Sequence, residues 1–144
     1  MDKITFEDYD EPELGADNLN QLQTNIEKAI YGTVLYSNSS GTTGNITFSE
    51  NISNGDSIEI IYRYSNNYKS TGKIPFTSGM NIILDIQNRE DSTAHSSRNK
   101  SINVTTSGIT VNNEQTQTIW NGNILAPSIA DSTLIAIMKV VAYK

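Results

Sequence analysis

The sequence predicts a mainly β protein, an antiparallel sandwich or jelly-roll-like module preceded by one short N-terminal α-helix. Helical periodicity is clear only near the start of the chain, and after Gly32 short β-type runs alternate with turns rich in Gly, Ser and Asn. The length of 144 residues fits one domain. We therefore divide the chain into an acidic arm over 1–15, a helix over 16–31 and a β domain over 32–144.

The composition is polar without having the character of a disordered chain. Hydrophobic residues make up 36% of the sequence and charged residues 18%, whereas Ser, Thr and Asn together supply about a third, well above ordinary usage. Disordered chains are poor in β-branched and aromatic residues, but this chain has apolar runs that contain both. The composition therefore favours a sheet with one solvated face, or a thin protomer that completes its core by oligomerising.

Charge and cysteine content exclude several classes of function. The net charge is −6, which disfavours a nucleic-acid partner because phosphate binding requires clusters of Lys and Arg. The absence of cysteine excludes disulfides, thiolate nucleophiles and Cys-ligated metals. The N-terminus is acidic and lacks the apolar segment that a signal peptide requires. No apolar run in the chain reaches membrane-spanning length. We expect a protein made in the cytoplasm without a signal peptide, and with no membrane partner.

Residues 17–30 carry the helical pattern, with Asp17 as a plausible N-cap and Gly32 as a plausible stop. One stripe of the helix is apolar, at spacings of three and four residues: Leu19, Leu22, Ile26, Ala29 and Ile30. A helix this short is marginal alone in water, so its stripe must pack on something. Either it lies on its own β domain, or copies of the chain associate along a trimer seam. The seam would comprise Leu19, Leu22, Ile26 and Ile30. Two heptads do not decide between these alternatives.

The rest of the chain predicts seven or eight short strands. They are 33–36, 45–48, 57–64, 81–86, 100–105, 109–112, 117–120 and 133–143. In the strongest of them, Ile58, Ile60 and Tyr62 share one face. The C-terminal run is apolar and must be buried, so we expect it as a central strand. The polar tract 87–99 is expected to be an exposed loop.

The sequence contains no convincing catalytic or metal-binding constellation. His95 is the single histidine, and a serine and an aspartate nearby in the same tract do not make a Ser/His/Asp site, which requires a base oriented in space. No calcium-loop spacing and no phosphate-binding glycine loop is present. We therefore expect no enzyme activity, no metal and no cofactor.

Aromatic side chains are better candidates for function, since an aromatic face can stack on the C–H patches of a sugar ring. Tyr62 and Tyr64 alternate in a strand and are expected to lie in the core. Trp120 precedes a turn, and Tyr68 follows one. The candidate ligand-binding residues are Trp120, Tyr68, Arg98 and His95.

Three stretches together resemble tail-fibre and baseplate proteins of phages infecting Gram-positive bacteria. Residues 15–27, with the pattern Ala-x-Asn-Leu-Asn followed by Ile26, resemble a segment near the start of such proteins. Residues 34–50, followed by 58–62, resemble one of their strand-loop-strand units. The ending Ile-Met-Lys-Val-Val-Ala-Tyr-Lys resembles their usual close, except that Ala142 replaces a glycine. The middle of the chain is not covered by the resemblance.

The resemblance implies a structural protein of a phage or prophage virion, located in the tail tip, baseplate or neck. Such proteins are commonly homotrimers that contact other tail proteins and often host-surface saccharides. This chain is much shorter than a tail fibre with its shaft. Three hypotheses follow: a module that recognises a host saccharide, a purely architectural tail component without a ligand, and, third, a cell-wall glycan hydrolase. The hydrolase would need two converging carboxylates, and the sequence singles out no such pair.

Overall fold

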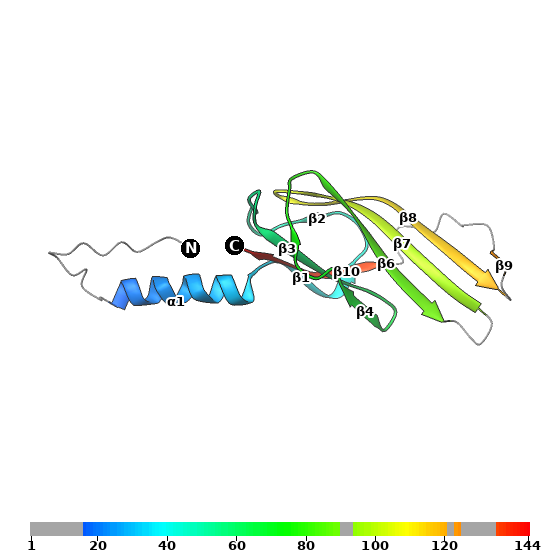
Figure 1. Cartoon of the computed structure of the whole chain (residues 1–144), viewed down its shortest axis with the longest axis horizontal. Helices are drawn as coiled ribbons and strands as arrows, with labels where there is room; N and C mark the ends of the chain where they lie inside the picture. The colour runs from blue at the N-terminus through cyan, green and yellow to red at the C-terminus, as the bar shows by residue number, and fades with distance from the viewer. Residues whose placement is uncertain (1–15, 90–93, 121–122, 125–134) are drawn as a thin grey trace.

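The computed structural model describes residues 16–89, 94–120, 123–124 and 135–144, which form two antiparallel β-sheets stacked as an open sandwich and one N-terminal helix (Figure 1). Side chains are described throughout these ranges except at 16–17, 88–89, 94–96, 114–120 and 123–124. The elements are α1 (Ala16–Tyr31), β1 (Thr33–Thr42), β2 (Ile46–Thr47), β3 (Ser57–Tyr64), β4 (Asn67–Ser70), β5 (Ile74–Pro75), β6 (Met80–Arg89), β7 (Ala94–Thr105), β8 (Gly108–Trp120), β9 (Asn123–Ile124) and β10 (Ala136–Tyr143). The mainly β class predicted from the sequence is confirmed.

The first sheet has the order β1-β10-β3-β4, with β5 also paired to β3. The C-terminal strand β10 lies between β1 and β3 in this sheet, and its Val140 pairs with Ile60 of β3. This confirms the expected central position of the apolar C-terminal run. The run is mostly apolar. Pairing with β1 and β3 satisfies its backbone groups, and its inner face packs on the core.

The second sheet has the order β2-β8-β7-β6, with β9 also paired to β8. Its centre is a meander of three long strands, in which β7 pairs with β6 along one edge and with β8 along the other. The β7–β8 hairpin contains the two strands predicted over 100–105 and 109–112. Figure 1 shows β6, β7 and β8 running toward one end of the molecule, while α1 projects from the opposite end.

The core lies between the sheets and is made of alternating strand residues. Ile58, Ile60 and Tyr62 are buried on one side and face Leu84 and Ile102 of the other sheet across one continuous cluster. Burying each of these large apolar side chains contributes about 1.5–3 kcal/mol. Further members of the cluster include Leu35, Phe48, Ile52, Phe76, Ile82, Ile86, Val104, Ile109, Ile135, Ile137 and Val140. The predicted core positions of Tyr62 and Tyr64 are confirmed, with Tyr64 partly buried against the cluster.

The helix α1 ends at Tyr31, directly before Gly32, the predicted stop. Gly32 has a φ of 71°, and its N–H donates to the Lys28 oxygen at 3.0 Å, which closes the last turn. The helix begins at Ala16, so Asp17 lies inside it and the prediction of Asp17 as N-cap is wrong. No helix of the described residues is long and apolar enough to cross a membrane.

The expected loop over 87–99 is wrong for most of its length. β6 continues to Arg89 and β7 begins at Ala94, and these two residues flank the segment 90–93, which lies outside the described residues. Residues such as Gln, Asn and Ser are poor strand formers in isolation, but a ladder running on from 80–86 and 97–105 satisfies their backbone groups. For the same reason β1 runs on to Thr42, beyond the strand predicted over 33–36.

Candidate functional site

The outward face of the three-stranded meander presents a row of small and polar side chains. Ile83 on β6 pairs with Ser101 on β7, which in turn pairs with Asn113 on β8. Directly paired residues of antiparallel strands project on the same face of a sheet. Ile83 is 68% exposed, although the residues on either side of it, Ile82 and Leu84, are buried. The row therefore places one aliphatic side chain on an otherwise polar surface.

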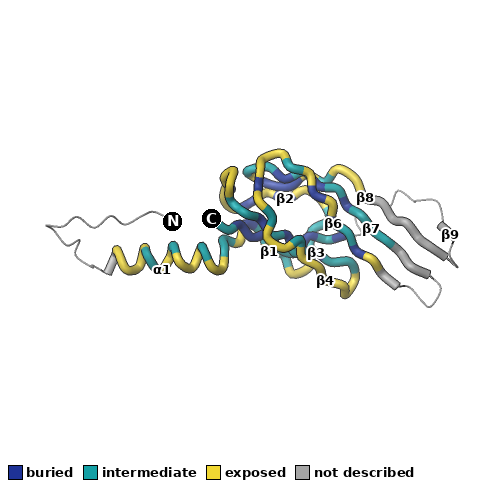
Figure 2. The backbone as a smooth tube through the Cα atoms, in the orientation of Figure 1, coloured by how far each residue is buried: buried dark blue, intermediate teal, exposed yellow. Residues whose placement is uncertain are grey.

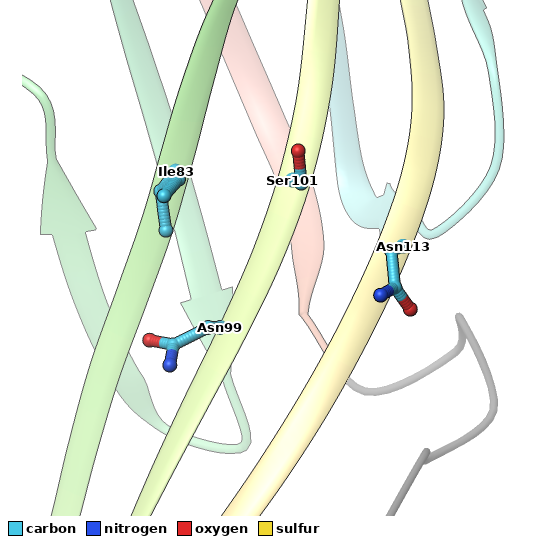
Figure 3. Close-up of a pocket in the computed structure, with 4 residues that line it drawn as sticks. All are labelled: Ile83, Asn99, Ser101 and Asn113. Atoms are coloured by element: carbon cyan, nitrogen blue, oxygen red, sulfur yellow. The ribbon is translucent and has the colours of Figure 1, made fainter.

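A shallow depression of about 180 Å³ lies on this face (Figure 3). It is lined by Ile83, Asn99, Ser101 and Asn113, which come from three neighbouring strands. Pockets for drug-sized ligands have volumes of about 300–1,000 Å³. The depression is therefore suited to one ring-sized group lying against the sheet.

An amide network borders the depression and holds its own groups in fixed directions. Asn103 Nδ2 donates to the Gly79 oxygen at 2.8 Å and to Asn81 Oδ1 at 3.2 Å, and Asn112 Nδ2 also donates to Asn81 Oδ1 at 3.4 Å. These side chains are neutral and come from β6, β7 and β8. Together with the lining residues they give this part of the face an uncharged, hydrogen-bonding character.

The structure does not bring Tyr68 and Arg98, two of the candidate ligand-binding residues, into one site. Tyr68 is 62% exposed and pairs with Arg63, so both project on the outer face of the β3–β4 hairpin. Tyr64, the next residue on β3, projects on the opposite face. The Arg98 guanidinium stacks on the Tyr64 ring at 3.9 Å from its centroid. Arg98 is thus held between the sheets, on the side of the β3–β4 hairpin away from Tyr68.

The backbones of His95 and Trp120 lie near the far end of the meander, on β7 and β8. His95 pairs with Ile119, and Trp120 pairs with Ala94. The side chains of His95 and Trp120 lie outside the described part of the chain, so their proposed roles in ligand binding stay predictions.

The helix α1 presents a second candidate surface, because it does not lie on its own β domain. Figure 2 shows exposed and intermediate residues along α1 and none buried among those described. In the apolar stripe, Leu19 is 49% exposed, Ile26 40% and Ile30 58%, while Leu22 and Ala29 are half-buried. Of the two alternatives for this stripe, packing on its own domain is therefore wrong for this chain taken alone.

Glu59, on the outer face of the first sheet, is the centre of a polar cluster. Its carboxylate accepts hydrogen bonds from the Ser70 hydroxyl at 2.6 Å and from the Tyr143 hydroxyl at 2.7 Å. These bonds lower the pKa of Glu59 below its ordinary value of 4.5, and the bond to Glu59 raises the pKa of Tyr143. The Lys73 ammonium lies 3.6 Å from the centroid of the Tyr143 ring. A carboxylate held ionised in this way acts as a fixed acceptor that ties β3 to β10.

The described residues contain no group of three or more His, Cys, Asp or Glu side chains placed to hold a metal ion. Comparisons of the chain with protein-family models, with curated proteins and with solved structures found no match.

The depression was not predicted from the sequence, although the sequence contains one signal for it. In the predicted strand 81–86, Ile82, Leu84 and Ile86 alternate with Asn81, Ile83 and Asp85. The other two members of the second set are polar, and Ile83 is its one aliphatic residue. Which neighbours surround it depends on the register with β7 and β8, and that register includes a shift between Ser101 and Ile102.

Proposed function

We propose that this chain is a virion appendage protein of a phage or prophage tail, in which copies associate through α1 and display β domains that recognise a saccharide on the host surface. The proposed role is binding and not catalysis. The observation that carries the proposal is the exposed apolar stripe on a helix that projects away from its own domain (Figures 1 and 2).

The stripe supports association between copies for a physical reason. A helix of 16 residues is marginal in water without tertiary packing, and this helix receives little from its own β domain. The spacing of Leu19, Leu22 and Ile26 is that of a coiled-coil seam. Beside the seam, Asn18, Gln23 and Asn25 are uncharged, so identical helices can approach in parallel without like-charge repulsion despite the net charge of −6. A trimer would suit the resemblance to phage appendage proteins.

The geometry of the molecule supports display of the β domain. Because α1 and the meander of β6, β7 and β8 extend in opposite directions (Figure 1), association through the helices leaves the outward face of the meander accessible. Several copies on one axis would raise the effective affinity for a repetitive surface by avidity, by about 10²–10⁴ over a single site.

A purely architectural tail component is the second candidate. The observation that favours it is that the described side chains lining the depression include no aromatic ring for stacking on a sugar. This candidate shares the helical association and differs in predicting no affinity for any saccharide.

The solution mass of the full chain by light scattering tests the shared part of the proposal. A trimer has a mass of about 48 kDa, three times the 15.9 kDa of one chain. The variant Ile26→Asn should fall to the monomer mass, since it places a polar amide in the seam. The control Gln21→Asn changes an exposed residue off the stripe and should keep the mass of the wild type. A wild-type chain that is monomeric at all concentrations would refute the proposal.

A further inference from the structure

We infer that the depression lined by Ile83, Asn99, Ser101 and Asn113 is a subsite for one ring of a neutral saccharide. This inference rests on the proposed function and gives its recognition step a place on the molecule. The site does not include the candidate ligand-binding residues expected from the sequence, and it lies on the outward face of β6, β7 and β8 (Figure 3).

The lining residues match the chemistry of a sugar ring. A pyranose presents C–H groups that need an apolar contact and hydroxyl groups that both donate and accept hydrogen bonds. Ile83 supplies an aliphatic contact and is 68% exposed, so it loses water-accessible apolar surface when a ring covers it. The amides of Asn99 and Asn113 and the hydroxyl of Ser101 each donate and accept, as hydroxyl partners require.

Strand pairing holds the backbones of the lining residues in place, which lowers the entropic cost of binding. These residues sit on three hydrogen-bonded strands, with Ile83, Ser101 and Asn113 in one cross-strand row. On the opposite side of the sheet, Ile82, Leu84 and Ile102 are buried in the core. Binding groups fixed on paired strands are already placed before the ligand arrives, so little conformational freedom is lost.

The charges around the depression favour a neutral ligand over a phosphate-bearing one. Its four lining residues are uncharged. On β7, Lys100 is fully buried and donates to the Thr43 oxygen at 2.9 Å, and the Arg98 guanidinium stacks on the Tyr64 ring. Lys69, which reaches β6 from the other sheet, is 2.9 Å from the Asp85 carboxylate. Binding a phosphate in this place would require a cation on the outward face, and the net charge of −6 opposes it further.

Titration of the ¹⁵N-labelled full chain with N-acetylglucosamine, followed by NMR, tests this inference. A single ring on an open face should bind with a dissociation constant of roughly 1 mM or weaker. We expect the side-chain amide signals of Asn99 and Asn113 to shift with saturation. Glycerol phosphate at the same concentrations should leave these signals unchanged.

Matched variants separate a specific contact from general perturbation. Ile83→Thr keeps a β-branched residue in the strand but removes the aliphatic contact, and it should weaken binding at least fivefold. Val34→Thr, on β1 of the other sheet, makes the same kind of change at a residue that is 44% exposed, and it should leave binding unchanged.

The possible results distinguish the inference from the proposed function. Shifts at Asn99 and Asn113 that saturate and weaken in Ile83→Thr support the site. Saturating shifts confined to other residues, or an Ile83→Thr variant that binds as well as the wild type, overturn the site while leaving saccharide recognition standing. Equal shifts with glycerol phosphate overturn the assignment of a neutral ligand. If neither N-acetylglucosamine nor the disaccharide and trisaccharide built from it gives any shift, the site is overturned, and the architectural component replaces saccharide recognition.

Discussion

Lys69 of the first sheet is bonded twice to Asp85 of the second, with its Nζ 2.9 Å from the carboxylate Oδ2 and 3.0 Å from the backbone oxygen. The Tyr62 hydroxyl donates to the same backbone oxygen at 3.1 Å. Asp85 lies on β6, which is the edge strand of its sheet. These bonds occupy a backbone acceptor that an edge strand would otherwise offer to another chain, and they fix the strand that carries Ile83.

Replacing Lys69 should therefore destabilise the protein modestly. The Lys69 and Asp85 side chains are 47% and 46% exposed, so the ion pair is screened and Lys69→Met should lower the free energy of unfolding by about 0.2–1 kcal/mol. Urea denaturation at low and high salt measures this, and the loss should shrink as salt is added. Lys144→Met, at an exposed position, is the matched control. If both variants lose the same stability, the bond between the sheets contributes nothing specific.

Glu59 should make stability depend on pH in a defined direction. Its pKa is lowered in the folded protein, chiefly by the hydrogen bond from Ser70 and then by that from Tyr143. The stabilisation is therefore fully present above the ordinary pKa of 4.5 and is lost as the pH falls through the lower folded value. Glu59→Gln should be less stable than the wild type at pH 7, and the difference should shrink by pH 3. A difference that stays constant between these two pH values in chemical denaturation would contradict this role.

Gly32, between α1 and β1, should not tolerate a side chain. A Cβ at this position would lie 2.5 Å from Val141 Cγ1 and 2.7 Å from the Ala142 oxygen, and its φ is 71°. Gly72 has a similar φ of 68°, but a Cβ there would have no neighbour within 4 Å. Gly72→Ala should therefore cost about 1–2 kcal/mol through the backbone alone, and Gly32→Ala about 1–3 kcal/mol more through overpacking. Equal losses in thermal or urea denaturation would show that the close approach of β10 is not a constraint.

Much of the fold could be predicted because it follows from patterns of neighbouring residues in the sequence. The alternation of Ile58, Ile60 and Tyr62 predicts a strand with one buried face, and an apolar C-terminal run predicts a central strand. The stripe of α1 and the stop at Gly32 follow from helix periodicity and from the conformation that glycine allows.

The remainder depends on pairing between distant segments. The polar strand ends around Arg89 and Ala94 have low strand propensity, and the ladders with neighbouring strands outweigh it. The candidate depression likewise depends on the register that brings Ile83, Ser101 and Asn113 into one row, with a register shift in β7–β8. The separation of Tyr68 from Arg98 also depends on long-range pairing, which sets the sheet and the face that each residue occupies.

Cross-linking through a single introduced cysteine tests the central claim, association of copies along the α1 stripe, most directly. The natural chain has no cysteine, so Leu22→Cys provides one thiol per copy in the seam, and Gln21→Cys provides one on the exposed side of the same helix. With a short bis-maleimide cross-linker at micromolar protein, we expect Leu22→Cys to give covalently linked chains in high yield and Gln21→Cys to stay single on a denaturing gel. If Leu22→Cys also stays single, or if both variants cross-link equally, the helices do not meet along this stripe and the proposed assembly is wrong.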